Sequence, residues 1–153
     1  MKSLFYKILI FNLLLISYHS GKAQSISFYD MKICLNSAES ADEHMSDIKF
    51  IRVSTKYIND GYLLSEYINN LKTVTVQVHT SSIFLQANVL TKDVYLKDKI
   101  FEDAVGDGFI SITTNDSDDN RKFYKKGNLQ LEIRFQKGIY SIILSRQRDC
   151  IQC

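Results

Sequence analysis

Strict alternation of apolar and polar residues marks three segments of the chain, at residues 73–79, 83–89 and 129–135. In the first of them, Val74, Val76 and Val78 are separated by polar residues. Successive side chains of a strand point to opposite faces of a sheet, so a period of two predicts strands with one buried face. The short connections "TSS" (80–82) and "QKG" (136–138) predict that these strands belong to hairpins.

A different period covers residues 92–105. Its apolar positions recur at intervals of three and four, which is the spacing of one face of a helix. The positions expected to face the core are Val94, the stem of Lys97, Ile100, Phe101, Ala104 and Val105. Gly106 and Gly108 follow this segment and predict where the helix ends.

The segment before the first strands, residues 28–48, is of mixed polarity and predicts two short helices. Met31, Cys34 and Leu35 form a short apolar stripe in the first of them. Ser37 or Ser40 can cap the second, because a serine hydroxyl accepts a hydrogen bond from the free N–H groups of a helix start.

The two halves of the chain resemble each other weakly. "KFIRVST" (49–55) is similar to "GFISITT" (108–114), and an Asn-Leu pair follows each phenylalanine after 20 residues in one half and 19 in the other. A helical segment precedes each phenylalanine and a hairpin follows each pair. We therefore expect an α+β fold of two tandem units, about 28–90 and 91–148, each a helix followed by antiparallel strands. The helices should pack on one face of a shared sheet.

With these pieces in place, the chain resembles small exported proteins of unknown function from Gram-negative bacteria. The resemblance is carried by "FYDMKICLNS", "KFIRV", "VYLKDKIFEDAVGDGF" and "YKKGNLQLEI" followed by "YSIILSR", and it spans most of the chain. The layout of paired helix-plus-sheet units is also similar to the folds of beta-lactamase-inhibitor-type proteins and of small outer-membrane-assembly lipoproteins. That similarity concerns the fold alone, and it implies binding of a partner through an exposed sheet face.

The first 23 residues have the pattern of a secretory signal peptide. Lys2 and Lys7 flank the start, an eleven-residue apolar run "ILIFNLLLISY" follows, and Gly21 and Ala23 supply the small residues of a cleavage site. The run is shorter than the roughly 20 residues that a membrane-spanning helix needs. We expect cleavage after Ala23, a single α+β domain over 24–153, and a location in the periplasm or outside the cell.

Removal of the leader changes the charge balance. Its three lysines account for the excess of base, and 16 basic residues then face 17 acidic ones. A net charge so close to zero predicts no nucleic-acid partner, and the mature form has no stable membrane span. From Arg121 onward, however, eight Lys and Arg residues face only Glu132 and Asp149. A solvated sheet face and a binding site for an anionic ligand both explain this local excess.

The three cysteines are Cys34, Cys150 and Cys153, the last two in a C-terminal "CIQC". A redox Cys-x-x-Cys normally opens a helix, whereas these two follow a predicted strand. In an oxidising compartment a structural disulfide is the leading interpretation. Cys34 could pair with either tail cysteine, which would close a long loop and stabilise the fold by about 4–5 kcal/mol in the chain-entropy model. A local bridge between Cys150 and Cys153 is the alternative.

No group of residues has the spacing of a catalytic, cofactor-binding or metal site. His44 and His79 are the histidines after the leader, both expected at the surface, and no G-x-S-x-G motif accompanies Ser81 or Ser82. The "DSDDN" segment imitates the start of a calcium loop, but Arg121 stands where the loop needs glycine. We therefore predict neither an enzyme nor a cofactor.

The predicted sheet offers one candidate interaction face, on the polar side of its strands. Its residues are Thr75, Gln77, His79, Phe84, Gln86 and Asn88, joined by Arg134, Arg146 and Arg148 if the sheet is continuous. An aromatic side chain among polar ones is common at interfaces. The sequence thus favours a non-catalytic binding module whose partner is an envelope or extracellular protein or an anionic ligand. A small envelope hydrolase or thiol oxidoreductase is the alternative, and a purely structural role stays open.

Overall fold

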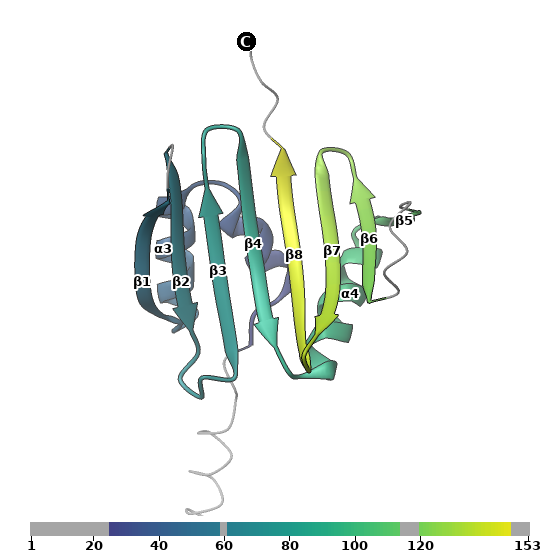
Figure 1. Ribbon diagram of the computed structural model, residues 1–153, viewed down its shortest axis with the longest axis horizontal. Coiled ribbons are helices and arrows are strands. Elements are labelled where there is room, and N and C mark those ends of the chain that lie inside the picture. Colours follow the sequence, from purple (N-terminus) through teal and green to yellow (C-terminus); the bar gives the residue numbers. More distant parts are fainter. Residues whose placement is uncertain (1–24, 59–60, 114–119, 148–153) are drawn as a thin grey trace, which may run out of the picture.

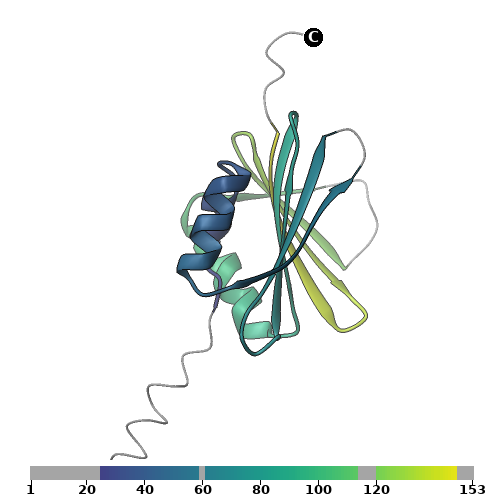
Figure 2. The same cartoon turned by 90° about the vertical axis from the view of Figure 1, so that its left-hand side faces the viewer.

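One antiparallel sheet and a layer of helices on one of its faces make up the described chain (Figures 1 and 2). The structure is a computed structural model that describes residues 25–58, 61–113 and 120–147. Its helices are α2 (Phe28–Cys34), α3 (Ala38–Asp47) and α4 (Val94–Gly106). Its strands are β1 (Ile51–Ile58), β2 (Tyr62–Ile68), β3 (Val74–Thr80), β4 (Phe84–Thr91), β5 (Ile110–Ile112), β6 (Arg121–Lys126), β7 (Leu129–Gln136) and β8 (Ile139–Gln147). The prediction of an α+β fold with an antiparallel sheet is confirmed.

The strands lie in the order β1-β2-β3-β4-β8-β7-β6-β5 (Figure 1). Each of the runs β1–β4 and β5–β8 is a meander of neighbouring antiparallel strands, as short connections between strands allow. The two runs meet where β4 pairs with β8, from Phe84 opposite Gln147 to Thr91 opposite Tyr140. This single pairing makes the sheet continuous.

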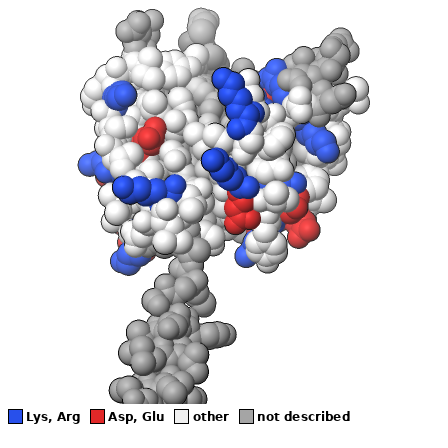
Figure 3. Space-filling view, turned by 60° about the horizontal axis from the view of Figure 1, so that its bottom comes forward, with Lys and Arg blue, Asp and Glu red and all other residues white. Residues whose placement is uncertain are grey.

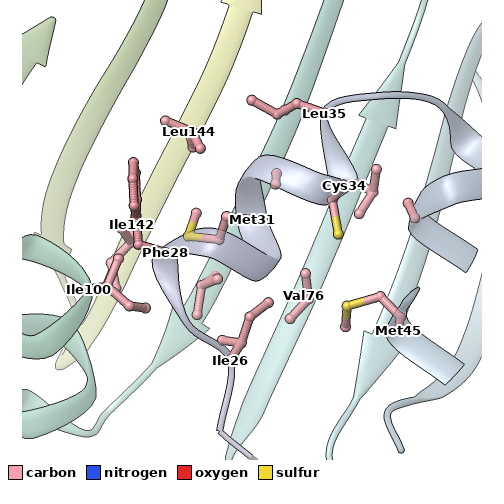
Figure 4. Close-up of a cluster of buried hydrophobic side chains, with 14 of the residues drawn as sticks. Ile26, Phe28, Met31, Cys34, Leu35, Met45, Val76, Ile100, Ile142 and Leu144 are labelled. Carbon is pink, nitrogen blue, oxygen red and sulfur yellow. The ribbon is translucent and has the colours of Figure 1, made fainter. Parts of the chain in front are cut away.

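The hydrophobic core lies between the sheet and the helices (Figure 4). Val76, Ile142 and Leu144 point from the sheet toward the helices, where Met31 of α2 and Ile100 of α4 pack against them. All five side chains are fully buried. Burial of apolar surface stabilises by about 25 cal/mol per Å², so this layer is the main source of stability.

The buried stripe of α4 differs from the predicted one. Leu96, Ile100 and Ala104 face the core, whereas Val94 and Val105 are half exposed. The extent of the helix was predicted within two residues, and Ile100 and Ala104 were predicted correctly, whereas Val94 and Val105 were wrongly expected to face the core. Leu96, which the prediction omitted, lies at the i, i+4, i+8 spacing with the other two.

The starts of α2 and α3 follow local sequence rules. Ser27 accepts a hydrogen bond from the backbone of Asp30, whose carboxylate in turn accepts from the Ser27 backbone at 2.6 Å, forming a capping box. Ser37 accepts from the Ser40 backbone at 3.0 Å and caps α3. Of the two serines predicted as the cap of the second helix, Ser37 has that role.

The ends of α3 and α4 have the same backbone conformation and hydrogen bonding. Lys49 and Gly108 both adopt positive φ angles, of 66° and 94°. The next residues, Phe50 and Phe109, donate their N–H groups back to Met45 and Ala104 at 2.8 and 3.1 Å. Lys49 and Gly108 also donate to the carbonyls three residues earlier, so each helix ends in a Schellman motif that turns the chain into a strand. Both phenylalanines are buried.

We expect substitutions at these two stops to have opposite effects. Gly108→Ala should lower the free energy of unfolding by about 1 kcal/mol, because a Cβ disfavours positive φ. Lys49→Gly should raise it by about 0.5 kcal/mol, since relief of the same strain exceeds the added freedom of the unfolded chain. Urea denaturation followed by circular dichroism measures both.

Gly106→Ala is the matched control, because Gly106 lies inside α4 with open space around the added Cβ. It should leave stability unchanged or raise it, as alanine favours helix. A Gly108→Ala protein as stable as Gly106→Ala would contradict the motif.

Candidate functional site

The face of the sheet opposite the helices is uncovered within the described chain (Figure 2). Six residues from the predicted interaction set lie on it, namely Thr75, Gln77 and His79 of β3 and Phe84, Gln86 and Asn88 of β4. Gln77 lies opposite Asn88 and His79 opposite Gln86. Alternation with the buried residues of both strands places them there, as the sequence predicts.

A chain of hydrogen bonds runs across this face and links four strands. Gln77 donates to the Glu66 carboxylate of β2 at 3.1 Å and accepts from the Asn88 amide at 3.3 Å. Asn88 in turn accepts from the Ser141 hydroxyl of β8 at 2.9 Å. Because each amide is held by both of its neighbours, the side chains are fixed before any partner arrives.

Aromatic side chains flank the hydrogen-bonded chain toward the β3–β4 turn. The rings of Tyr62 and Phe84 lie 5.8 Å apart in a tilted arrangement. His79 is partly buried nearby, and burial holds its pKa below the ordinary value. His79 is therefore neutral at pH 7, so this end of the face offers an apolar and uncharged polar surface.

An ion cluster occupies the same face on β6 and β7. The buried Glu132 accepts from Nε of Arg121 at 2.9 Å and from Nη2 of Arg134 at 2.9 Å. Burial alone would raise the pKa of Glu132, but hydrogen bonds from Arg134 and Arg121 hold it below its usual range. The Arg121 guanidinium also lies over the Phe123 ring at 5.2 Å. One carboxylate thus positions two guanidinium groups.

Three arginines were also predicted to lie on this face, and their positions differ. Arg134 lies on it, within the ion cluster. Arg146 does not, because it alternates with Ser145 and shares the helix-covered side with Ile142 and Leu144. Its Nη1 donates to the carbonyl of Leu35 at 3.4 Å. Arg148 lies outside the described residues.

Sequence patterns did not identify the partners that organise this face. Glu66, Ser141, Arg121 and Glu132 were not predicted as members. Each lies on the polar side of a strand, which alternation can show. Their contacts depend on the register between strands, and no local signal gives the register.

Among the described residues, His44 and His79 do not pair with a serine as a nucleophile and its base. His44 is not at the surface as predicted, because Nε2 lies 2.7 Å from Oδ1 of Asp30 and the side chain is 20% exposed. Ser27 bonds the other oxygen of Asp30, not the histidine. Ser81 Oγ is bonded within its own turn, to Phe84. No group of three metal-binding side chains occurs among the described residues.

Cys34 is fully buried at the end of α2, with its sulfur inside the core (Figure 4). Burial, with the Asp30 carboxylate adding to it, raises the pKa of this thiol to about 12. The thiolate is the reactive form of cysteine, so Cys34 is chemically inert in the folded protein. Cys150 and Cys153 lie outside the described residues.

A hollow lies on the helix-covered side of the sheet, against α4. It has a volume of about 360 Å³ and an aromatic wall, and its polar groups include Lys97 and Asp98. These two side chains form an ion pair with each other, and Lys97 also lies over the Tyr140 ring at 5.4 Å. Lys97 and Asp98 are therefore engaged within the protein, and Lys122 is a further charged residue of the wall.

Comparison with protein-family models, with curated proteins and with solved structures finds no match to this chain. Within the described ranges, no helix is both long and apolar enough to cross a bilayer. The candidate site therefore stands on the geometry of the uncovered face.

We expect Glu132→Gln to destabilise the protein by about 1 kcal/mol at pH 7, because two guanidinium groups lose their shared charge partner while partly exposed to solvent. A carboxyl group whose pKa is lowered by folding stabilises above its unfolded pKa of about 4.3, and this stability is lost as the pH falls. The variant should therefore show a flatter fall in stability on acidification. Urea denaturation at a series of pH values measures it.

Glu102→Gln is the control, because Glu102 is exposed on α4 and forms no ion pair within the described residues. It should leave stability and its pH dependence as in the wild type. Equal effects of the two substitutions would show that the cluster on the sheet face contributes nothing.

Proposed function

We propose that this chain is an exported, non-catalytic binding module that uses the uncovered sheet face to hold a protein partner of the envelope or the extracellular space. The observation that carries the proposal is the hydrogen-bonded chain from Glu66 through Gln77 and Asn88 to Ser141. A continuous polar surface fixed in advance loses little conformational entropy on binding.

The breadth of the face and the types of side chain on it support a protein partner over a small molecule. This face is broad and carries side chains from most of the strands, whereas the hollow that opens on it is confined to one end, beside Thr75 and Leu90. Aromatic and arginine side chains are the residues that most often dominate binding energy at protein interfaces. Here they are represented by Phe84 and Arg134, which are partly exposed, Phe84 toward the β3–β4 turn and Arg134 opposite Ser141.

The guanidinium groups of Arg121 and Arg134 surround the Glu132 carboxylate at this end of the face. Guanidinium groups match carboxylates in geometry, which favours a partner whose contact surface carries acidic groups. The exported location rests on the signal-peptide pattern of residues 1–23, which lie outside the described residues.

The proposal predicts which substitutions weaken partner binding. A partner cross-linked to the protein beginning at Gln24, identified by mass spectrometry and purified, should bind Phe84→Ala and Arg134→Ala at least about tenfold more weakly than the wild type. Isothermal titration calorimetry measures the affinity. Hydrogen exchange should show protection of β3 and β4 on binding.

Tyr95→Ala is the control, because Tyr95 is 77% exposed on α4, in the layer opposite the uncovered face. Its affinity should equal that of the wild type. A partner that protects the helices, or that binds all three variants equally, would exclude the uncovered face as the binding surface.

We also propose that the chain arose from two tandem units, about 28–90 and 91–148. The matching Schellman motifs support this, because Lys49 and Phe50 correspond to Gly108 and Phe109 in the sequence similarity and in hydrogen bonding. The strand order supports it too, since the last strand of each meander pairs with the other. The units differ in that two helices precede the first meander and one precedes the second.

For the cysteines, we propose the local Cys150–Cys153 bridge, the alternative that leaves Cys34 reduced. Its support is the full burial of Cys34 beneath the helix layer. The end of β8 does lie near α2, through the contact of Arg146 with Leu35, so a long-range bridge needs only the exposure of the Cys34 sulfur.

Thiol labelling separates these two disulfides. In the native protein, iodoacetamide should leave Cys34 unlabelled on the timescale that labels a free exposed thiol, and urea should make it reactive. Non-reducing peptide mapping should then recover Cys34 as a labelled peptide. A peptide that joins Cys34 to the C-terminal tail would establish the long-range bridge instead.

A further inference from the structure

One end of the sheet gathers lysines from connections that are far apart in the sequence. Lys72 lies between β2 and β3, Lys92 between β4 and α4, and Lys137 between β7 and β8. The strand register places them together, because Ile68, Thr75, Leu90 and Ser141 occupy one row across the sheet just before these connections. Figure 3 looks toward this end and shows Lys and Arg side chains across it. We call Leu71, Lys72, Lys92, Lys137 and Ile139 the basic end.

The backbone accommodates lysine here at a conformational cost. The described residues other than glycine with positive φ are Lys49, Lys72 and Lys137, at 66°, 54° and 52°. All three lie in connections at this end of the sheet. Glycine adopts such angles in the hairpin connections as well, at Gly61 and Gly127 at the opposite end and at Gly138 beside Lys137. Positive φ disfavours any residue with a Cβ, so Lys72 and Lys137 occupy positions where glycine would be less strained.

The ammonium groups of the basic end form no ion pair within the described residues. Lys32 and Lys126 both pair with Asp107, whereas Lys56 and Lys125 on the strands are also without an ion pair within the described residues. Asp93 is an acidic residue near the basic end. Its Oδ1 accepts hydrogen bonds from the backbone of Tyr95 and Leu96 and so caps α4. This local positive charge persists although the charge of the whole chain nearly cancels.

A hollow of about 690 Å³ opens on the sheet face at this end. Lys72 and Lys92 lie on its wall, together with Thr75, Leu90 and Ile139. Its wall therefore combines ammonium groups, threonine hydroxyls and aliphatic side chains with the carboxylate of Asp93. This combination suits an anion attached to an apolar body.

Exposed apolar side chains accompany the lysines. Leu71 is 65% exposed beside Lys72, and Ile139 is 38% exposed two residues after Lys137. At the start of α4, Tyr95 is exposed as well. Lysines ringed with exposed aliphatic and aromatic residues are typical of surfaces that enter the headgroup layer of a membrane.

From these observations we propose that the basic end docks on the surface of a bilayer that contains anionic phospholipid. The lysines contact the headgroup phosphates, Leu71 and Ile139 enter the headgroup layer, and one phosphate group lies in the hollow between Lys72 and Lys92. A bilayer fits better than a soluble anion, because a free anion gives the exposed Leu71 and Ile139 nothing to pack against.

Docking by the basic end sets the orientation of the molecule, because the strands run from this end to the opposite one (Figure 1). The uncovered sheet face is then upright on the membrane and accessible from the side.

Vesicle sedimentation tests the proposal on the protein beginning at Gln24, whose buried core lies entirely between Ile26 and Leu144. The probes are vesicles of phosphatidylcholine alone and vesicles with about 30% phosphatidylglycerol. We expect binding to the anionic vesicles only, and loss of binding at about 1 M salt, where charges are screened beyond roughly 3 Å.

The triple variant Lys72→Gln, Lys92→Gln and Lys137→Gln should bind the anionic vesicles roughly 100-fold more weakly, at about fivefold for each lysine. Leu71→Ser with Ile139→Thr should weaken binding while leaving its dependence on salt unchanged. The matched control is Lys56→Gln with Lys122→Gln and Lys125→Gln, which removes the same charge from exposed strand positions. It should bind within about twofold of the wild type.

Three outcomes would overturn the proposal. They are the absence of binding to anionic vesicles, an equal loss in both triple variants, and binding abolished by millimolar inorganic phosphate at constant ionic strength. The last would identify a site for a free anion. Circular dichroism and urea denaturation must show each variant folded, and Lys137→Asn, which keeps a residue tolerant of positive φ, replaces Lys137→Gln if that variant unfolds.

Discussion

The pairing of β4 with β8 is the interaction on which the rest of the structure depends. It brings together segments far apart in the sequence, as the 53 residues between Asn88 and Ser141 show. It places the buried Ala87 opposite Leu144, beneath the helices. Without it, each meander would have an apolar face too small for its own core and an additional unpaired edge. The continuous sheet gives all three helices one common surface to cover.

The same pairing creates the uncovered face. Because strands alternate, the register that places Ala87 toward the core also places Asn88 on the other side, within reach of Ser141. The hydrogen-bonded chain therefore spans both meanders and not one alone. The ion cluster of Glu132 extends the polar surface toward the opposite edge. The same strand register thus provides both the buried core that stabilises the protein and the proposed binding surface.

The basic end consists mainly of connections between strands, and it meets the uncovered face at the hollow lined by Thr75 and Leu90. Its residues are held by turns and not by the core, so they can change with little effect on packing. Lys72 and Lys137 show a local cost accepted in the turns, whereas Gly61 and Gly127 avoid that cost at the other end. A protein whose proposed binding face lies on its side and whose lysines lie at one end can contact two partners at once.

The sequence by itself determined several elements of this protein. Alternation identified β3, β4 and β7 but not β2 or β6. Ser37 was one of two serines that could start α3, and Gly106 with Gly108 indicated the end of α4, because each signal depends on backbone geometry within a few residues. Only the tertiary structure decided that Arg146 lies under the helices and that Glu132 lies between two arginines. Those facts follow from strand register and from packing between distant segments. No local pattern encodes them, since moving a strand by one residue exchanges its two faces.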